Sequence, residues 1–105
     1  MLPKEKRIPR EQFKELLLSR KFSNSPHFSL RIGVATMPRF AVAVSKKVSK
    51  SAVVRNRIRR RVYNVISSSI DLFSPGLYLF IAKSGADKLK VEHIKTELDK
   101  LIKKG

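Results

Sequence analysis

The sequence predicts an α+β fold, a two-layer α/β sandwich that forms a single domain over residues 1–105. The chain has 105 residues, of which 42% are hydrophobic, and this length suits one domain with one modest core. Some segments carry apolar residues at helical spacing, whereas others alternate apolar and polar residues or are apolar throughout, as strands are. Long helices combined with a few strands favour helices packed on a mixed sheet. The predicted order of elements is α-β-β-(β)-α-β-α, in which the bracketed strand is a short additional one.

The chain is expected to open with a flexible basic lead-in over residues 1–9, followed by a short helix over about 10–20. Segment 21–26 is mostly polar and contains a proline, so it predicts a loop. The apolar residues that place one face of this helix against the core are Phe13, Leu16 and Leu17.

Two strands are predicted next, and we expect them to pair as a hairpin. Segments 27–36 and 40–44 both alternate, which is typical of a strand with one buried face. Because the connection at Met37-Pro38 is short, the two strands should lie side by side and run antiparallel. The buried face of the first strand would carry Phe28, Leu30, Ile32 and Val34.

The second half of the chain predicts a long helix over about 52–70, a strand over 77–82, a loop over 83–89 and a closing helix over 91–104. The strand is apolar without interruption, so it should be buried on both faces at the centre of the sheet. The residues expected to face the core are Val54, Ile58, Val62, Val65, Ile66 and Ile70 in the long helix, and Ile94, Leu98, Leu101 and Ile102 in the closing helix.

Net charge indicates a polyanionic partner. The chain has 24 Lys and Arg against 8 Asp and Glu, a net charge of +16. No acidic residue occurs between Glu15 and Asp71, a stretch that holds 12 Lys and Arg. Such a surface suits the phosphate backbone of a nucleic acid, and an anionic membrane is the competing polyanion.

Several classes of protein are disfavoured by composition. The chain has no cysteine, which excludes disulfides and thiolate metal sites and fits a cytoplasmic location. No apolar run approaches the roughly 20 residues of a membrane span, and the basic N-terminus has no apolar region typical of a signal peptide.

The segment 45–61 is the most informative one. Eight of its 17 residues are Lys or Arg and none is acidic. Like charges three or four residues apart on a helix repel each other, so the free helix is slightly destabilised until phosphates neutralise it. At 100° per residue, the residues opposite the apolar stripe are Asn56, Arg57, Arg60 and Asn64, with Arg55 and Arg59 flanking them.

The run Val44-Ser45-Lys46-Lys47, followed after a short spacer by Arg55-Asn56-Arg57-Ile58-Arg59-Arg60, resembles the signature of the bacterial ribonuclease P protein subunit. Arg7-Ile8, Glu11-Gln12-Phe13 and the segment 77–83 are similar to other parts of that family, so the resemblance covers nearly the whole chain.

The resemblance implies a ribosomal protein S5 domain 2-like sandwich with a left-handed β-α-β crossover, although such crossovers are usually right-handed. It implies an RNA-binding subunit of an endoribonuclease that removes the 5′ leader of precursor tRNA. The implied partners are ribonuclease P RNA and precursor tRNA, without a membrane or a small-molecule substrate. The implied cofactor is Mg²⁺, held mainly by the RNA, and the chemistry would belong to the RNA, so no side chain is expected to be catalytic.

Two groups of binding residues follow from the resemblance. The basic helix and its preceding loop would contact the catalytic RNA, and a cleft between the first helix and the sheet would hold the single-stranded leader. Ser29 and Arg31 depart from the apolar and aromatic residues expected in that strand, although a guanidinium group can stack on a base. The RNA-contacting residues would be Lys46, Lys47, Lys50, Arg55, Asn56, Arg57, Arg59, Arg60 and Asn64. The cleft residues would be Phe13, Leu17, Ser29 and Arg31.

Other interpretations remain. A structural RNA-binding protein of the ribosome or its assembly would use the same basic helix. A membrane-surface helix would need bulkier apolar residues than Val and Ile. A metal-dependent nuclease in its own right is disfavoured, because it would need converging carboxylates and the acidic residues show no metal-ligand pattern. The acidic residues beyond the basic segment, expected to be solvated surface charges, are Asp71, Asp87, Glu92, Glu97 and Asp99. His27 and His93 belong to no motif, and His27 is expected on the polar side of its strand.

Overall fold

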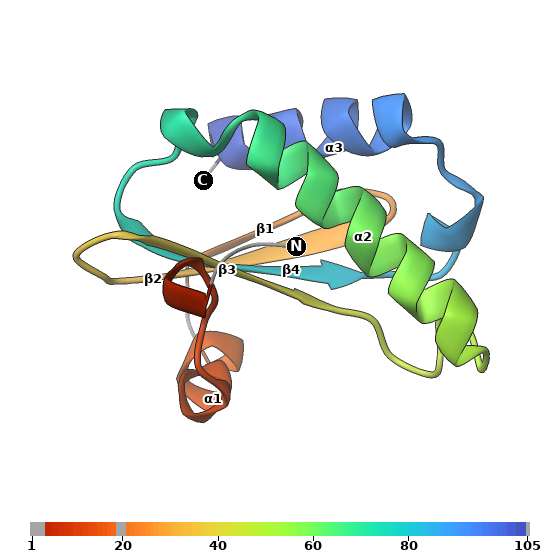
Figure 1. The fold of residues 1–105 in the computed structure, drawn as a ribbon, viewed down its shortest axis with the longest axis horizontal. Coiled ribbons are helices and arrows are strands. Elements are labelled where there is room, and N and C mark those ends of the chain that lie inside the picture. Colours follow the sequence, from red (N-terminus) through yellow and green to blue (C-terminus); the bar gives the residue numbers. More distant parts are fainter. Residues whose placement is uncertain (1–3, 19–20, 105) are drawn as a thin grey trace.

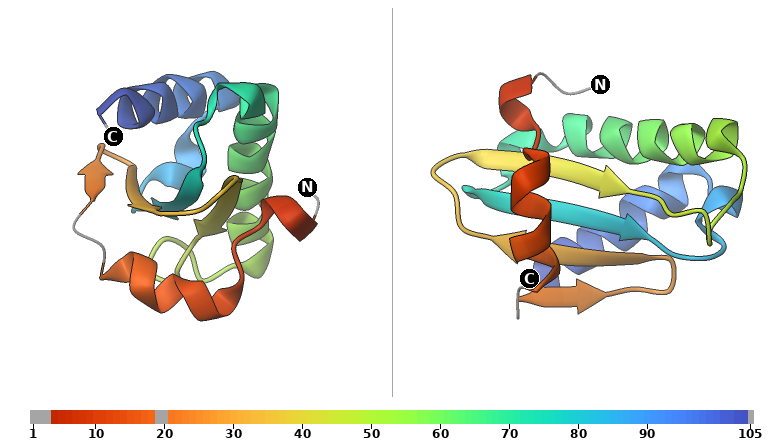
Figure 2. Two further views of the ribbon diagram at one scale, coloured as in Figure 1. Left: turned by 90° about the vertical axis from the view of Figure 1, so that its left-hand side faces the viewer. Right: turned by 90° about the horizontal axis from the view of Figure 1, so that it is seen from below.

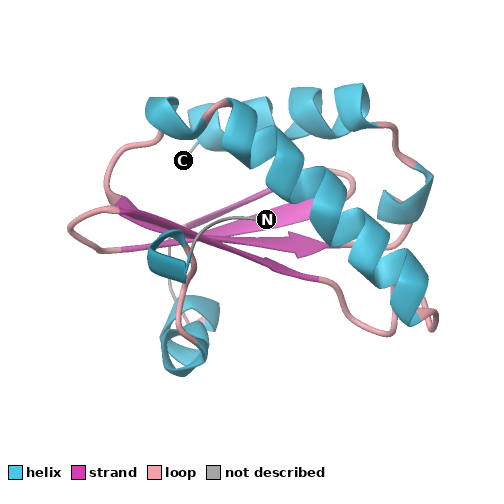
Figure 3. Ribbon diagram, in the orientation of Figure 1, coloured by secondary structure: helices cyan, strands magenta, loops and turns pink. Residues whose placement is uncertain are grey.

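The computed structural model describes residues 4–18 and 21–104 as a four-stranded sheet with helices on both faces (Figures 1 and 3). Helices α2 (Ala52–Ser68) and α3 (Val91–Lys104) cover one face, and the short α1 (Phe13–Leu17) lies on the other. This arrangement confirms the predicted α+β sandwich. The strands are β1 (Phe22–Asn24), β2 (Phe28–Gly33), β3 (Pro38–Ala43) and β4 (Gly76–Ala82), and the 3-10 helices are η1 (Lys4–Lys6), η2 (Arg10–Gln12), η3 (Ile70–Leu72) and η4 (Ala86–Lys88).

Strand β4 is central, as predicted, but the expected hairpin of β2 with β3 is wrong. The strand order is β1-β2-β4-β3, so β4 pairs antiparallel with β2 and parallel with β3. The physical reason is that β4 is apolar on both faces, and only a central strand buries both. Because β4 lies between β2 and β3, the connection between those two strands crosses the end of β4 at its first residue, Gly76. There the Gly76 N–H donates to the Met37 carbonyl oxygen at 3.4 Å, and a Cβ at Gly76 would lie 3.2 Å from the Gly33 carbonyl oxygen.

The crossover from β3 through α2 to β4 is left-handed. In the right-hand view of Figure 2, β3 lies above β4, both strands point to the right, and α2 lies behind the sheet. This is the handedness that the family resemblance implied, and it is opposite to that of most β-α-β units. The crossover carries α2 over β3, so its basic residues lie near that edge of the sheet.

The sheet is covered on both faces rather than half-buried. The main core lies under α2 and α3, and a second, smaller core lies under α1 and includes Ile8, Leu16 and Leu79. Leu16 packs so closely on β2 that a Cβ at Gly33 would lie 2.7 Å from its Cδ2 atom. Val34 is beyond the end of β2 and is 98% exposed, so its predicted burial is wrong.

The N-terminal elements differ from the prediction in their extents. The expected helix over 10–20 is a turn of η2 followed by α1, and its last two predicted positions lie outside the described residues. Leu17 is 51% exposed instead of packed in the core. The expected loop over 21–26 contains β1, which pairs with β2 and is the additional strand. A strand of three residues is too short to show periodicity of its own, and it depends on hydrogen bonds from its neighbour.

The described part of the expected lead-in, residues 4–9, lies along the outer edge of β3. The Ile8 N–H donates to the Phe40 carbonyl oxygen at 3.1 Å, and Arg7 bridges to Phe40 in parallel fashion. Ile8 is buried in the second core. In the described parts of the chain, no helix is long and apolar enough to cross a lipid bilayer.

Candidate nucleic-acid interface

The loop before α2 is held in place by its own hydrogen bonds. The Ser51 side chain caps the helix by accepting from the Val54 N–H at 3.3 Å, as serine at this position commonly does. Nη1 of Arg55 donates to the Ser49 carbonyl oxygen at 2.9 Å, and Val48 packs partly against the main core. The loop therefore presents its three exposed lysines, Lys46, Lys47 and Lys50, from a tethered backbone.

The outer face of α2 exposes the residues that helical spacing placed there. Asn56, Arg57, Arg60 and Asn64 are exposed, and Arg59 beside them is half-buried. Nη1 of Arg59 donates to Oδ1 of Asn56. A shallow depression of about 380 Å³ opens on this face and is lined by Val53, Asn56, Arg59 and Arg60. Forked guanidinium donors and side-chain amides around a depression suit phosphate and ribose oxygens.

This cationic face is not neutralised from within the described chain. Helix α2 has no acidic residue, and no carboxylate of residues 4–18 or 21–104 lies within ion-pair distance of its arginines. Arg61 points away from the face, and its Nη1 donates to the Leu89 carbonyl oxygen at 3.0 Å. An external polyanion would therefore relieve the repulsion between the remaining arginines.

Tyr63 of α2 is buried in the main core, next to Val42 of β3. Burial raises the pKa of the Tyr63 hydroxyl above its ordinary value, and the backbone of Val42 and the nearby guanidinium groups of Arg7 and Arg59 act in the opposite direction. Arg7 comes from the segment that pairs with the outer edge of β3, so this segment contributes one of the cations near Tyr63. From the sequence, Arg7 is only part of an N-terminal segment similar to that of the family. Nothing in the sequence predicts that this segment lies near α2.

The predicted leader-binding residues lie on the face of the sheet that carries α1. Phe13 and Leu17 come from α1, and Ser29 and Arg31 come from β2. Phe13 packs against the second core, and Ser29 is buried. The role of these four residues stays a prediction.

Phe22 is a residue of this face that sequence reasoning missed. It is 51% exposed, and its β1 position is opposite Arg31 on β2. The Arg31 guanidinium lies 4.6 Å from the centre of the Phe22 ring, in a cation–π contact. The aromatic ring expected in β2 is therefore supplied by the neighbouring strand. The available signal was a lone aromatic residue in an otherwise polar segment.

Glu97 is not the solvated surface charge that the sequence predicted. Its side chain is only 13% exposed and accepts three hydrogen bonds from the turn between β1 and β2. The Ser25 hydroxyl donates to Oε2 at 2.7 Å, and the His27 N–H donates to the same oxygen at 3.0 Å. Nδ1 of His27 lies 2.9 Å from Oε1, so His27 ties this turn to α3.

The described residues do not fit a protein-bound magnesium site. Within residues 4–18 and 21–104, no group of three or more His, Asp or Glu side chains comes together to hold a metal ion. A hard divalent cation prefers several oxygen ligands, which a nucleic acid can supply.

The fold and the site define a small α+β protein with a left-handed crossover and an unneutralised cationic helix above the edge of the sheet. Comparison with known proteins makes the assignment specific. The family model described as Ribonuclease P matches residues 2–105, and the chain belongs to this family.

Relatives and solved structures agree with this assignment. The chain is 39% identical over 64 residues to the ribonuclease P protein component of Rippkaea orientalis. The matched region covers 60% of this chain and 50% of that protein. The match to the Geobacter sp. protein component is 35% identical and covers 90% of this chain and 82% of the relative. The structure of the Staphylococcus aureus RNase P protein superposes with a TM-score of 0.84 over 93% of both chains at 20% identity, a likeness of fold.

Proposed function

We propose that this chain is the protein subunit of a ribonuclease P holoenzyme, where it binds the catalytic RNA and helps to remove the 5′ leader of precursor tRNA. The observation that carries this proposal is the cationic face of α2, ordered by its loop and free of carboxylates in the described chain. Membership of the ribonuclease P family supports it. The RNA-contacting residues would be Lys46, Lys47, Lys50, Arg55, Asn56, Arg57, Arg59, Arg60 and Asn64.

The leader would bind on the opposite face of the sheet, beside α1. A single-stranded RNA is commonly held by an aromatic ring for base stacking and by cationic groups for its phosphates. Phe22 and Arg31 offer this pair on adjacent strands, with Phe13 and Leu17 on α1 and Ser29 on β2 completing the surface. The two RNA partners would therefore approach opposite layers of the sandwich.

The chemistry of cleavage would belong to the RNA and its Mg²⁺ ions, in the cytoplasm where precursor tRNA is made. The protein would contribute charge, because each Lys or Arg that contacts a phosphate replaces a condensed cation. Two strongly anionic RNAs, catalytic RNA and substrate, could then associate with less free Mg²⁺. No protein side chain is assigned a catalytic role.

Reconstitution tests this proposal. Cleavage of a precursor tRNA by a bacterial ribonuclease P RNA would be followed at low Mg²⁺, with and without this protein. We expect the protein to restore cleavage at the correct 5′ position, more strongly for substrates with a leader than for those with a minimal one. Tight binding of the RNA without any gain in cleavage would instead support a structural RNA-binding protein.

A further inference from the structure

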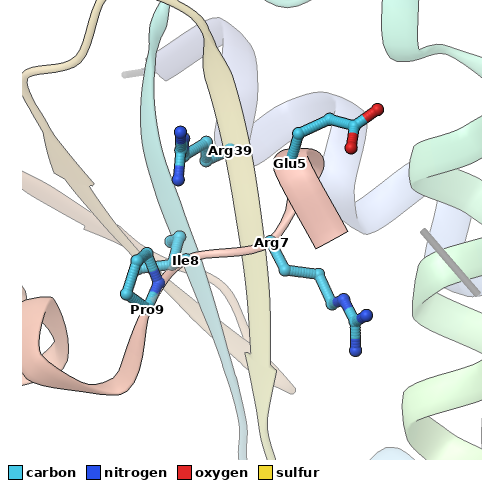
Figure 4. Close-up of a pocket in the computed structure, with 5 residues that line it drawn as sticks. All are labelled: Glu5, Arg7, Ile8, Pro9 and Arg39. Carbon is cyan, nitrogen blue, oxygen red and sulfur yellow. The ribbon is translucent and has the colours of Figure 1, made fainter. Parts of the chain in front are cut away.

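A second cationic site lies at the outer edge of β3, outside the residues assigned so far. It is a depression of about 510 Å³ lined by Glu5, Arg7, Ile8, Pro9 and Arg39 (Figure 4). Two of the five lining residues are arginines, which come from the N-terminal segment and from β3. In the described chain, neither arginine forms an ion pair with Glu5.

The backbone beneath this depression is ordered by pairing. The hydrogen bond from the Ile8 N–H to the Phe40 carbonyl oxygen and the burial of Ile8 hold the segment against β3. Pairing of this kind alternates side chains between the two faces, so Arg7 and Ile8 point in opposite directions. Arg7 is therefore presented from a defined position rather than from a loose tail.

The two guanidinium groups lie on either side of the edge of β3. Arg7 points toward α2 in Figure 4 and acts on the Tyr63 hydroxyl together with Arg59 of α2. Arg39 and Ala41 are two residues apart in β3, so their side chains point to the same face of the sheet. Ala41 belongs to the core under α1, so Arg39 lies on the α1 face. Along the surface, the order from the basic helix to the α1 face is Arg59, Arg7 and then Arg39.

We propose that Arg7 and Arg39 bind phosphodiester groups of RNA and connect the cationic face of α2 with the α1 face around the edge of β3. This inference rests on the proposed function and extends it, because it assigns RNA contacts to a segment outside the α2 signature. Planar guanidinium groups suit this role, since each offers paired N–H donors to two phosphate oxygens. The unpaired edge of a sheet is also blunted here, because the N-terminal segment covers part of it.

Salt-dependent binding is the first test. The affinity of a bacterial ribonuclease P RNA for the full chain would be measured over a series of salt concentrations. The double variant Arg7→Gln/Arg39→Gln removes both charges but keeps two of the three methylenes of each side chain and leaves the backbone pairing in place. The matched control is Lys95→Gln/Lys100→Gln, which removes the same charge from α3. This helix packs over β1 and β2, toward the edge of the sheet opposite β3. Far-UV circular dichroism and the thermal midpoint check that both variants fold.

We expect the Arg7/Arg39 double variant to lower the slope of log K against log salt by about 1 for each lost contact, whereas the control changes the slope by much less. Equal losses in the two double variants would overturn the inference, because they would show a general effect of charge. Failure of the unaltered chain to bind the RNA would instead overturn the proposed function.

Photo-crosslinking gives a second measurement that reports contact directly. The chain has no cysteine, so Arg7→Cys and Lys95→Cys each create one attachment point for a photoreactive label. We expect the label at position 7 to crosslink to the RNA and the label at position 95 to give little product. Crosslinking at position 95 alone would contradict the placement of RNA along the edge of β3.

Discussion

Nη1 of Arg55 lies 2.9 Å from the Ser49 carbonyl oxygen, and this hydrogen bond ties the first turn of α2 to the loop that carries the lysines. Arg55 therefore has a role within the folded chain, whereas Arg57 and Arg60 are exposed on the outer face of α2. Arg57 and Arg60 should thus act in RNA binding only, whereas Arg55 should also position the loop.

Arg57→Ala and Arg60→Ala should each weaken RNA binding and lower the salt slope of log K by about 1, because each removes one phosphate contact. Their thermal midpoints should stay close to that of the parent chain, since both side chains are exposed. Filter binding over a salt series measures the slope. A slope that does not change would exclude direct phosphate contact by that residue.

Arg55→Ala should weaken RNA binding and also lower stability by about 1 kcal/mol, because the bond to the Ser49 carbonyl oxygen is lost. Urea denaturation of Arg55→Ala beside Arg57→Ala measures the difference. If the two variants are equally stable, the tether between α2 and its loop contributes nothing to the folded state.

Val62→Asp should unfold the domain, because Val62 is fully buried on the inner face of α2 and an unpaired carboxylate there loses its hydration. Asn64→Asp, which adds the same charge on the exposed face of the same helix, should retain the fold. Circular dichroism during heating distinguishes them. A native thermal midpoint for Val62→Asp would show that the assigned buried face of α2 is wrong.

Glu97→Gln should destabilise the domain by about 1–3 kcal/mol, because an amide offers one acceptor oxygen to three donors from Ser25 and His27. The control is Glu92→Gln, an exposed carboxylate on the same helix, which should change stability little. Denaturant titration compares the two. If Glu97→Gln and Glu92→Gln are equally stable, the carboxylate contact between α3 and the β1–β2 turn does not contribute to the free energy of unfolding.

Phe22→Ala should reduce affinity for a precursor tRNA that has a leader by roughly 1–3 kcal/mol, the usual worth of one stacked base. Affinity for mature tRNA should not change, because only the leader is proposed to lie on the α1 face. The measurement is holoenzyme binding of both RNAs. An equal loss for both would place Phe22 outside the leader path.

Prediction from the sequence worked where neighbouring residues carry the information. The apolar stripe of α2 and the opposite cationic face follow from 3.6-residue spacing, and the bounds of α3 follow in the same way. The central position of β4 follows from its uninterrupted apolar run. The position of the short strand β1 and the length of α1 were missed, because each depends on packing against a neighbour.

The chain's local pattern determined its helices, its buried strand and its basic face, because these properties depend on residues within a few positions of each other. Tertiary structure decided which strands pair, and so it placed Phe22 beside Arg31, Glu97 beside His27, and Arg7 near α2. Each of these three arrangements brings together residues from different elements. The strand order that creates them is set by the stability of the whole sheet. Burying β4 on both faces stabilises the domain more than the short-range hairpin of β2 with β3 would.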